Sequence, residues 1–427
     1  MKLEIGFKMI QRSHKYPDEY HSALQHSEFP IAEKSPYSKK RVLIGWEWKN
    51  TYAPPSQRER RERWIETSPH RAFILGTTGS GKTFFQKSLI SRFYKSGYNC
   101  FIVDLHDEYS QMCEPIQEKF REFLNKNEKP EGLKVLTIRP LFFQKYSQEE
   151  DKKSVYFQIP FSEITAQDLI DFCGLDAGYS DIIIKHKESC DTIEEFLETV
   201  SAKEKAKPLV RAIENIIENK VIGDGNVIDF IKEFNEGKII VLNLLGYESV
   251  INKYYQVYIK HILAKIFNAR GNAVRGYSGS KLKSEIFIFI DEAHSIMPKD
   301  ANNMAVKEVV KLVVEGRKFG LSFYFSTQKL ESVNTAAYDQ SKYLFISNNN
   351  KNFSDLDKLM KFSGAYDAHW RFKNKLSEML YAMKNFGEWR CWGLFPEKIN
   401  PDHPRLELFF PFSPVCAHYS TSEDKKR

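Results

Sequence analysis

Residues 76–83 read Gly76-Thr77-Thr78-Gly79-Ser80-Gly81-Lys82-Thr83 and fit the phosphate-binding pattern G-x-x-x-x-G-K-[ST] at every position. Glycines let such a loop turn so that successive backbone N–H groups point inward, where they can donate hydrogen bonds to phosphate oxygens. In this pattern Lys82 reaches the β- and γ-phosphates, and the hydroxyl of Thr83 is a ligand for Mg²⁺. The stretch therefore predicts a site for ATP and Mg²⁺ in which all eight residues take part.

The flanking sequence supplies the strand and the helix that this loop requires. Residues 72–75 are apolar and predict a strand, and residues 83–96 predict a helix. Further apolar runs alternate with helical patterns; the runs are 99–105, 238–245, 285–290, 321–326 and 342–347, and the helices 252–269 and 305–315. Continuous apolar strands are typical of a parallel sheet covered on both faces. We expect an α/β core, a P-loop NTPase fold with a mostly parallel sheet.

The apolar strand at 286–290 ends in two carboxylates, Asp291 and Glu292. Asp291 is placed to join the shell of the metal, and Glu292 is a candidate general base for the attacking water. Strands that merely meet solvent also end in acids, but an intact phosphate loop requires such a partner. We therefore predict ATP hydrolysis.

The tetrapeptide Asp291-Glu292-Ala293-His294 also occurs in two-lobed DEAH helicases. Those enzymes need a second lobe with its own arginine motif, and nothing after Gln328 has that pattern. The 209 positions from Lys82 to Asp291 are also a long interval for that class. The sequence disfavours this alternative.

A third motif follows the predicted helix at 305–315. Glu315-Gly316-Arg317-Lys318-Phe319-Gly320 precedes an apolar strand that ends in Ser326-Thr327-Gln328. This order resembles the HerA branch of the HerA/FtsK translocases, in which a glycine–arginine–lysine turn precedes a strand ending in Thr-Gln. Residues 104–109 (DLHDEY) resemble the Asp-Pro-His-Gly-Glu-Tyr of that family, with Leu105 and Asp107 as departures. The likeness extends over roughly residues 71–348.

The resemblance implies a RecA-like core, a hexameric ring of identical subunits and ATP-driven movement along duplex DNA. It makes Gln328 a polar sensor of the γ-phosphate and Arg317 an arginine that stabilises the charge of the transition state, a role that suits a guanidinium. A surface ion pair with Glu315 remains the other interpretation of Arg317. Asp104 and Glu108 are expected either to tune the metal site or to cap a loop.

We predict that a helical insertion interrupts the core and that additional segments extend it at both ends. We assign residues 67–160 and 237–400 to the RecA-like ATPase core, and residues 161–236, whose periodicity is helical, to a helical insertion. A further helix is expected at 111–125. Residues 1–66 form an N-terminal extension with a β-prone stretch at 41–48 and a basic helix starting at Ser56, and residues 401–427 a C-terminal tail. The arginines of the basic helix either form a solvated face or meet DNA or a neighbouring subunit.

Cellular HerA-like proteins carry an N-terminal β-barrel, and the roughly 70 residues before the phosphate loop are too few and too irregular to form it. This departure weakens the case for a repair-nuclease partner and favours a viral or mobile-element partner. The function we predict is an ATP-dependent DNA translocase acting as a ring, in genome packaging, DNA processing or transfer. An ATP-binding switch or assembly scaffold with little motor activity is the alternative, although it could dispense with Glu292.

Charge and cysteine content exclude little. The formal net charge of +7 permits nucleic-acid binding without demanding it. The candidate DNA contacts lie in a basic loop and after the acidic motif: Arg275, Lys281, Lys283 and Lys299. Solvated loops explain these residues equally well. With six scattered cysteines, a charged N-terminus and apolar runs of only strand length, we expect a cytoplasmic protein without disulfides, zinc or a membrane segment.

Overall fold

The computed structural model describes the chain over the stretches 41–48, 60–77, 79–146, 154–175, 177–203, 206–245, 252–282, 284–300, 304–338, 341–347, 391–395, 405–411 and 413–418. In these stretches twelve strands form one sheet, in the order β2-β1-β12-β11-β10-β3-β9-β8-β4-β7-β5-β6. The strands from β10 to β6 in this order run parallel to one another. Their bounds are β3 (Arg71–Leu75), β4 (Asn99–Asp104), β5 (Val135–Pro140), β6 (Ser154–Phe157), β7 (Ile239–Asn243), β8 (Ile286–Ile290), β9 (Leu321–Thr327) and β10 (Tyr343–Ser347). The predicted α/β fold with a mostly parallel sheet is confirmed.

Four antiparallel strands extend this sheet at one end: β1 (Arg41–Trp48), β2 (Arg60–Glu66), β11 (Cys391–Phe395) and β12 (Arg405–Pro411). The strand at 41–48 was expected. The basic helix expected from Ser56 was wrong over Arg60–Glu66, because alternate residues there, Arg63 and Ile65, are buried against the rest of the protein. The segment 401–427, expected as a tail, instead contributes β12 to the sheet.

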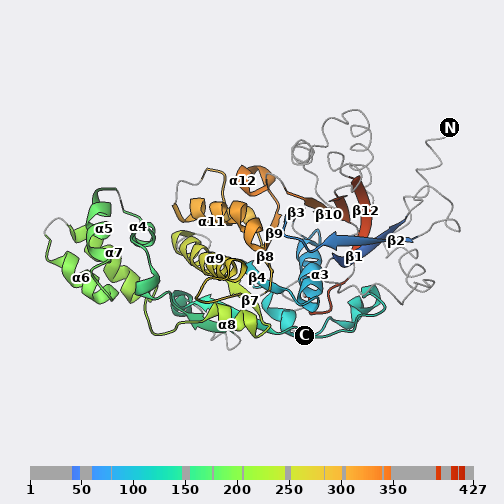
Figure 1. The fold of residues 1–427 in the computed structure, drawn as a ribbon, viewed down its shortest axis with the longest axis horizontal. Helices are drawn as coiled ribbons and strands as arrows, with labels where there is room; N and C mark the ends of the chain where they lie inside the picture. The colour runs from blue at the N-terminus through green and yellow to red at the C-terminus, as the bar shows by residue number, and fades with distance from the viewer. Residues whose placement is uncertain are drawn as a thin grey trace.

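Side chains of the sheet alternate between two helical layers. On β3, Ala72 and Ile74 belong to the core that includes α3 (Lys82–Lys95), whereas Phe73 and Leu75 face the core of the other side. That second core contains α9 (Asn252–Arg275) and α11 (Met304–Glu315), which Figure 1 shows side by side on one side of the sheet. Both faces of the parallel sheet are therefore covered, as its continuous apolar strands require.

The segment 161–236, for which helical periodicity was predicted, contains five helices among its described residues. They are α4 (Ala166–Cys173), α5 (Ser180–Lys187), α6 (Ile193–Ser201), α7 (Lys207–Glu218) and α8 (Phe230–Asn235). Thr165 and Thr192 form capping boxes at the starts of α4 and α6, so their hydroxyls satisfy backbone N–H groups that the helices leave unpaired. Figure 1 shows α5, α6 and α7 gathered at one end of the molecule, away from the sheet.

The C-terminal segment Ser413–His418 packs against the back of α3. Lys87 Nζ donates to the carbonyl oxygen of Ala417 at 3.2 Å, and Arg92 Nη1 to that of Ser413 at 3.3 Å. The helix expected at 111–125 is replaced by 3₁₀ turns at Ser110–Cys113 and Glu118–Phe123. Pro115 between them cannot donate to a helix and instead forms an isolated β-bridge with Cys416 of this C-terminal segment.

The remaining short helices are α10 (Ala293–Ile296) and α12 (Thr335–Tyr338), with 3₁₀ turns η4 (Leu141–Tyr146), η5 (Phe161–Glu163), η6 (Ala177–Tyr179), η8 (Gly316–Phe319) and η9 (Leu330–Ser332). Among the helices in the described part of the chain, none combines the length and the apolar character that crossing a bilayer requires.

His70 precedes β3 and is buried in the core, so its protonation should affect the stability of the protein. Its Nδ1 lies 2.6 Å from the Ser68 carbonyl oxygen and its Nε2 2.6 Å from the Tyr324 hydroxyl, and burial lowers the pKa of His70 from 6.5 to about 4. Between pH 6.5 and 4 the unfolded chain binds a proton there that the native protein does not. We expect acidification across this range to lower the free energy of unfolding by about 3 kcal/mol through this residue. Urea unfolding at several pH values should show a flatter pH dependence for His70→Gln; an equally steep one would contradict this assignment.

Candidate active site

The carboxyl ends of three neighbouring strands bring the predicted nucleotide residues together. β3, β9 and β8 are adjacent and parallel, so they end at the same edge of the sheet. The phosphate loop follows β3, Gln328 follows β9, and Asp291 and Glu292 follow β8. Ligands of open α/β sheets bind at this edge. The sequence motifs, up to 252 residues apart, thus form one candidate site.

The phosphate loop turns through two glycines in the left-handed region, Gly79 at φ 74° and Gly81 at φ 88°. Lys82, the first residue of α3, is only 7% exposed, and its Nζ donates to the carbonyl oxygens of Gly76 at 2.8 Å and Thr77 at 3.2 Å. Burial lowers the pKa of Lys82, while the charges of Glu292, Asp291 and Glu108 act in the opposite direction. The ammonium group therefore rests on the loop itself, with carboxylates nearby. Thr78 lies outside the described residues.

Asp291 and Glu292 occupy different environments. Asp291 is 4% exposed and accepts hydrogen bonds from the Ser326 hydroxyl and, at 3.0 Å, from the backbone N–H of Glu292; burial raises its pKa to about 6. Glu292 has a left-handed backbone with φ 45°, an uncommon conformation for a residue with a side chain. Such outliers gather at functional sites.

The carboxylate of Glu292 is held from two sides. Gln328 Nε2 donates to Oε1 at 2.8 Å, and His294 Nδ1 lies 3.3 Å from Oε2 and 3.1 Å from the Thr327 hydroxyl. Burial alone raises the pKa of Glu292, but the hydrogen bonds from His294 and Gln328 and the charge of Lys82 outweigh it, so the net pKa is lowered. Glu292 is thus ionised at neutral pH, as a general base must be. The sequence interpretation assigned no site role to His294 or Ser326, although both stand within its quoted motifs.

The residues present fit a magnesium ion that is shared with phosphates. Thr83 in the first turn of α3 offers a hydroxyl oxygen and Asp291 a carboxylate, and Mg²⁺ prefers oxygen ligands. No group of three or more His, Cys, Asp or Glu side chains that could hold a metal ion occurs among the residues that the structure describes. A Mg²⁺ ion would therefore be held by these two groups together with phosphate oxygens and water, which is its usual mode in nucleotide sites.

The motif at 104–109 follows β4, the parallel neighbour of β8, and so lies at the same edge of the sheet as the site. Asp104 accepts the backbone N–H groups of His106, Glu108 and Tyr109, so it caps this loop, one of the two roles considered for it. Asp107, one of the departures from the family pattern, has φ 55°, so the glycine of that pattern stands where the backbone is left-handed. Aspartate tolerates this conformation.

Arg317 lies at the opposite edge of the sheet. It belongs to η8, which precedes β9, whereas Gln328 follows the same seven-residue strand. A strand of that length spans about 20 Å, so Arg317 is beyond side-chain reach of the phosphate loop in its own chain. Its side chain is exposed, and its charge acts on His70, the residue just before β3.

The candidate DNA contacts do not form one surface. The expected loop is helical up to Arg275, the last residue of α9, whose guanidinium lies 4.9 Å from the ring centre of Phe319. Lys281 is exposed at the edge where β8 begins. Lys299 is exposed beyond the other edge, after β8 and α10. Lys283 lies outside the described residues.

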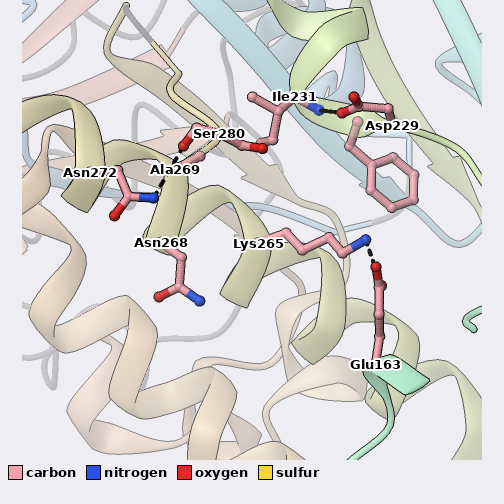
Figure 2. Close-up of a pocket in the computed structure, with 9 residues that line it drawn as sticks. Glu163, Asp229, Ile231, Lys265, Asn268, Ala269, Asn272 and Ser280 are labelled. Carbon is pink, nitrogen blue, oxygen red and sulfur yellow. Dashed lines mark hydrogen bonds and ion pairs between the residues drawn. The ribbon is translucent and has the colours of Figure 1, made fainter. Parts of the chain in front are cut away.

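A pocket of about 320 Å³ lies away from the phosphate loop, between α8, α9 and the segment after α9 (Figure 2). Lys265 of α9 and Glu163 form an ion pair of 2.6 Å at its wall, and Asn272 Nδ2 donates to the carbonyl oxygen of Ser280 at 3.2 Å. Since its lining contains none of the residues of the phosphate loop or the strand ends, the pocket adds no residue to the candidate active site.

Comparison with known proteins shows which proteins the chain resembles. Residues 68–266 match the family model of the central domain of helicase HerA. The DNA double-strand break repair helicase HerA of Sulfurisphaera tokodaii is 25% identical over 276 residues, which are 61% of this chain and 51% of the relative. That of Saccharolobus solfataricus is 26% identical over 276 residues, covering 60% and 50%. The chain therefore spans about half the length of the curated relatives that it matches.

The fold has a solved counterpart. VirB4 of Thermoanaerobacter pseudethanolicus superimposes with a TM-score of 0.55 and 12% identity, over 90% of this chain and 98% of that one. This likeness concerns the fold alone. The match to the HerA central domain and the curated HerA relatives show that the chain is similar to HerA-like ATPases over its central part, and the solved structure shows a shared fold.

Proposed function

We propose that the chain is an ATP-dependent DNA translocase of the HerA/FtsK class that works as a ring of identical subunits, six in number, on duplex DNA. The observation that carries the proposal is the separation of Arg317 from the phosphate loop, at opposite edges of one sheet. An arginine that is exposed at one edge can complete a nucleotide site only on a second copy. Such an arrangement gives each ATP site two subunits, so hydrolysis in one can shift its neighbour.

The chemistry follows from the residues at the strand ends. The phosphate loop and Lys82 bind the triphosphate, and Thr83 and Asp291 would hold Mg²⁺, which supplies charge neutralisation on the phosphates when bound. Glu292 accepts the proton of the attacking water, and Gln328, hydrogen-bonded to Glu292, orients that water or senses the γ-phosphate. The work done on DNA is packaging, processing or transfer, with a nuclease, viral or mobile-element partner.

Steady-state ATPase assays with and without duplex DNA test the proposal, together with the mass of the assembly in the presence of a non-hydrolysable ATP analogue. We expect duplex DNA to stimulate turnover and the assembly to have the mass of a hexamer. The competing function, an ATP-binding switch or scaffold, predicts tight nucleotide binding with turnover that DNA does not change. Lys82→Ala serves as the control for contaminating ATPases.

DNA affinity should fall steeply with salt, because a translocase contacts phosphates rather than base edges. Each lost phosphate contact lowers the slope of log K against log salt by about 0.9 for duplex DNA. Replacing Lys281 and Lys283 by alanine should therefore weaken binding to all sequences and lower the slope by about 2. Fluorescence anisotropy at several salt concentrations measures both. An unchanged slope, with Lys299→Ala lowering it instead, would move the DNA contact to the other edge of the sheet.

A further inference from the structure

The arginine turn, Gly316–Gly320, carries Arg317 and is fixed at both of its ends. A Cβ on Gly316 would lie 3.0 Å from the ring of Phe323 and 3.1 Å from Leu321, so the turn begins in direct contact with β9. Gly320, which closes the turn at φ 82°, is equally confined, because a Cβ there would lie 2.7 Å from Arg270 Nη2. Arg317 and Lys318 between these ends are exposed.

Arg270 is the residue against which the turn closes. It lies in the last two turns of α9, is 6% exposed, and its guanidinium bonds two backbone carbonyls from different segments. Nε donates to the Phe319 carbonyl oxygen of the arginine turn at 2.9 Å, and Nη1 to the Leu282 carbonyl oxygen, just before β8, at 2.8 Å. Only the planar, multi-donor guanidinium provides two such bonds in fixed directions.

Neighbouring contacts also hold the arginine turn on α9. The Phe319 ring packs against Phe267 of α9 with ring centres 4.6 Å apart, and the guanidinium of Arg275 covers it. Burial lowers the pKa of Arg270, and the charge of nearby Glu285 opposes that effect. The turn is thus held on α9 by a charged group, a ring and a close backbone approach, all next to Arg317.

We propose that Arg270 is a positioning residue for Arg317: it holds the arginine turn on α9 so that Arg317 projects at the angle needed to reach the ATP of the next subunit. The inference rests on the proposed action of Arg317 in trans. Arg270 itself acts through Arg317 and not on the nucleotide, because its guanidinium is buried and bonds the Phe319 and Leu282 carbonyl oxygens.

Arg270→Lys tests the inference with little threat to folding, because lysine keeps the charge beside Glu285 and most of the buried stem. A single ammonium cannot reproduce the two bonds in fixed directions, so Arg317 should be misplaced. Misplacement of a reacting group by about 1 Å can cost about 10²-fold in rate. We expect kcat to fall by that order, with nucleotide affinity and the unfolding midpoint unchanged.

The decisive measurement is a double-mutant cycle with Arg317→Ala, using radiolabelled ATP to follow low turnover. If Arg270 acts through Arg317, adding Arg270→Lys to Arg317→Ala lowers turnover less than twofold further. Arg139→Lys is the matched control, since Arg139 is also buried and donates to a backbone carbonyl, that of Leu245 at 2.6 Å, but far along the sheet on β5. It should have little effect alone and the same small effect in either background.

A second arm mixes Arg270→Lys with Lys82→Ala subunits, which retain both Arg270 and Arg317. Turnover should recover, because intact phosphate loops then face correctly placed arginines. Equal losses from Arg270→Lys with and without Arg317, or full activity of Arg270→Lys alone, would overturn the inference. Full activity of Arg317→Ala would instead overturn the proposed role of Arg317, so the two failures are distinguishable.

Discussion

Replacing Glu292 by glutamine should lower ATP turnover by about 10²–10⁴-fold while leaving ATP bound, because only the proton acceptor is lost. Glutamine has the size of glutamate and keeps an oxygen that can accept the hydrogen bond from Gln328. The phosphate loop, Lys82 and Asp291 are untouched, so the dissociation constant for ATP should change little. Single-turnover hydrolysis and equilibrium binding of a fluorescent ATP analogue measure the two quantities separately.

Glu118→Gln is the control for this change, since Glu118 lies exposed on a 3₁₀ turn outside the site and should be as active as the parent. Loss of ATP binding in Glu292→Gln would show that the carboxylate is needed to bind ATP and not only to accept a proton. Parental turnover would remove Glu292 from the role of base altogether.

Arg317→Ala should lower turnover by about 10³–10⁵-fold, the contribution of arginines supplied in trans in other phosphoryl-transfer systems. Arg317 is exposed and is separated from its own phosphate loop by the length of β9, about 20 Å. An intact Arg317 on a neighbouring subunit should therefore restore the lost activity. Mixing Arg317→Ala with Lys82→Ala subunits, each nearly inactive alone, should restore part of the activity. With random mixing, roughly one subunit boundary in four would pair an intact Lys82 with an intact Arg317.

Subunit exchange has to be shown for this mixture, for example by energy transfer between differently labelled subunits. Recovery should rise and fall with the mixing ratio and be largest near equal amounts. In rings that exchange, absence of recovery would assign Arg317 to its own subunit or to a purely structural role, such as a surface ion pair with Glu315.

The sequence predicted most of the fold because its main elements can be recognised from short stretches of consecutive residues. The strand Ile286–Ile290 is apolar throughout, as burial on both faces demands, and the phosphate loop is recognisable residue by residue. The candidate site could be assembled from such motifs, since parallel strands bring their carboxyl ends to one edge.

Elements decided by distant partners could not be predicted in this way. Arg60–Glu66 has the charged composition of a solvated helix, but its pairing with β1 makes it a strand. Helix formation at 111–125 is prevented by Pro115 and by bonds to the C-terminal segment some 300 residues later. The contact of His294 with Glu292 likewise depends on a left-handed backbone that no sequence pattern revealed.

The packing of Ser413–His418 against α3 also sets an order of events during synthesis. Ser91 of α3 meets Cys416, 325 positions later, and Arg92 reaches the carbonyl oxygen of Ser413, 321 positions later. These contacts cannot form before residues 413–416 have left the ribosome, whereas domains otherwise begin to fold from the N-terminal side as they emerge. The helix that follows the phosphate loop is therefore covered late, and a nascent chain that ends before this segment exposes the back of the helix to chaperones and proteases.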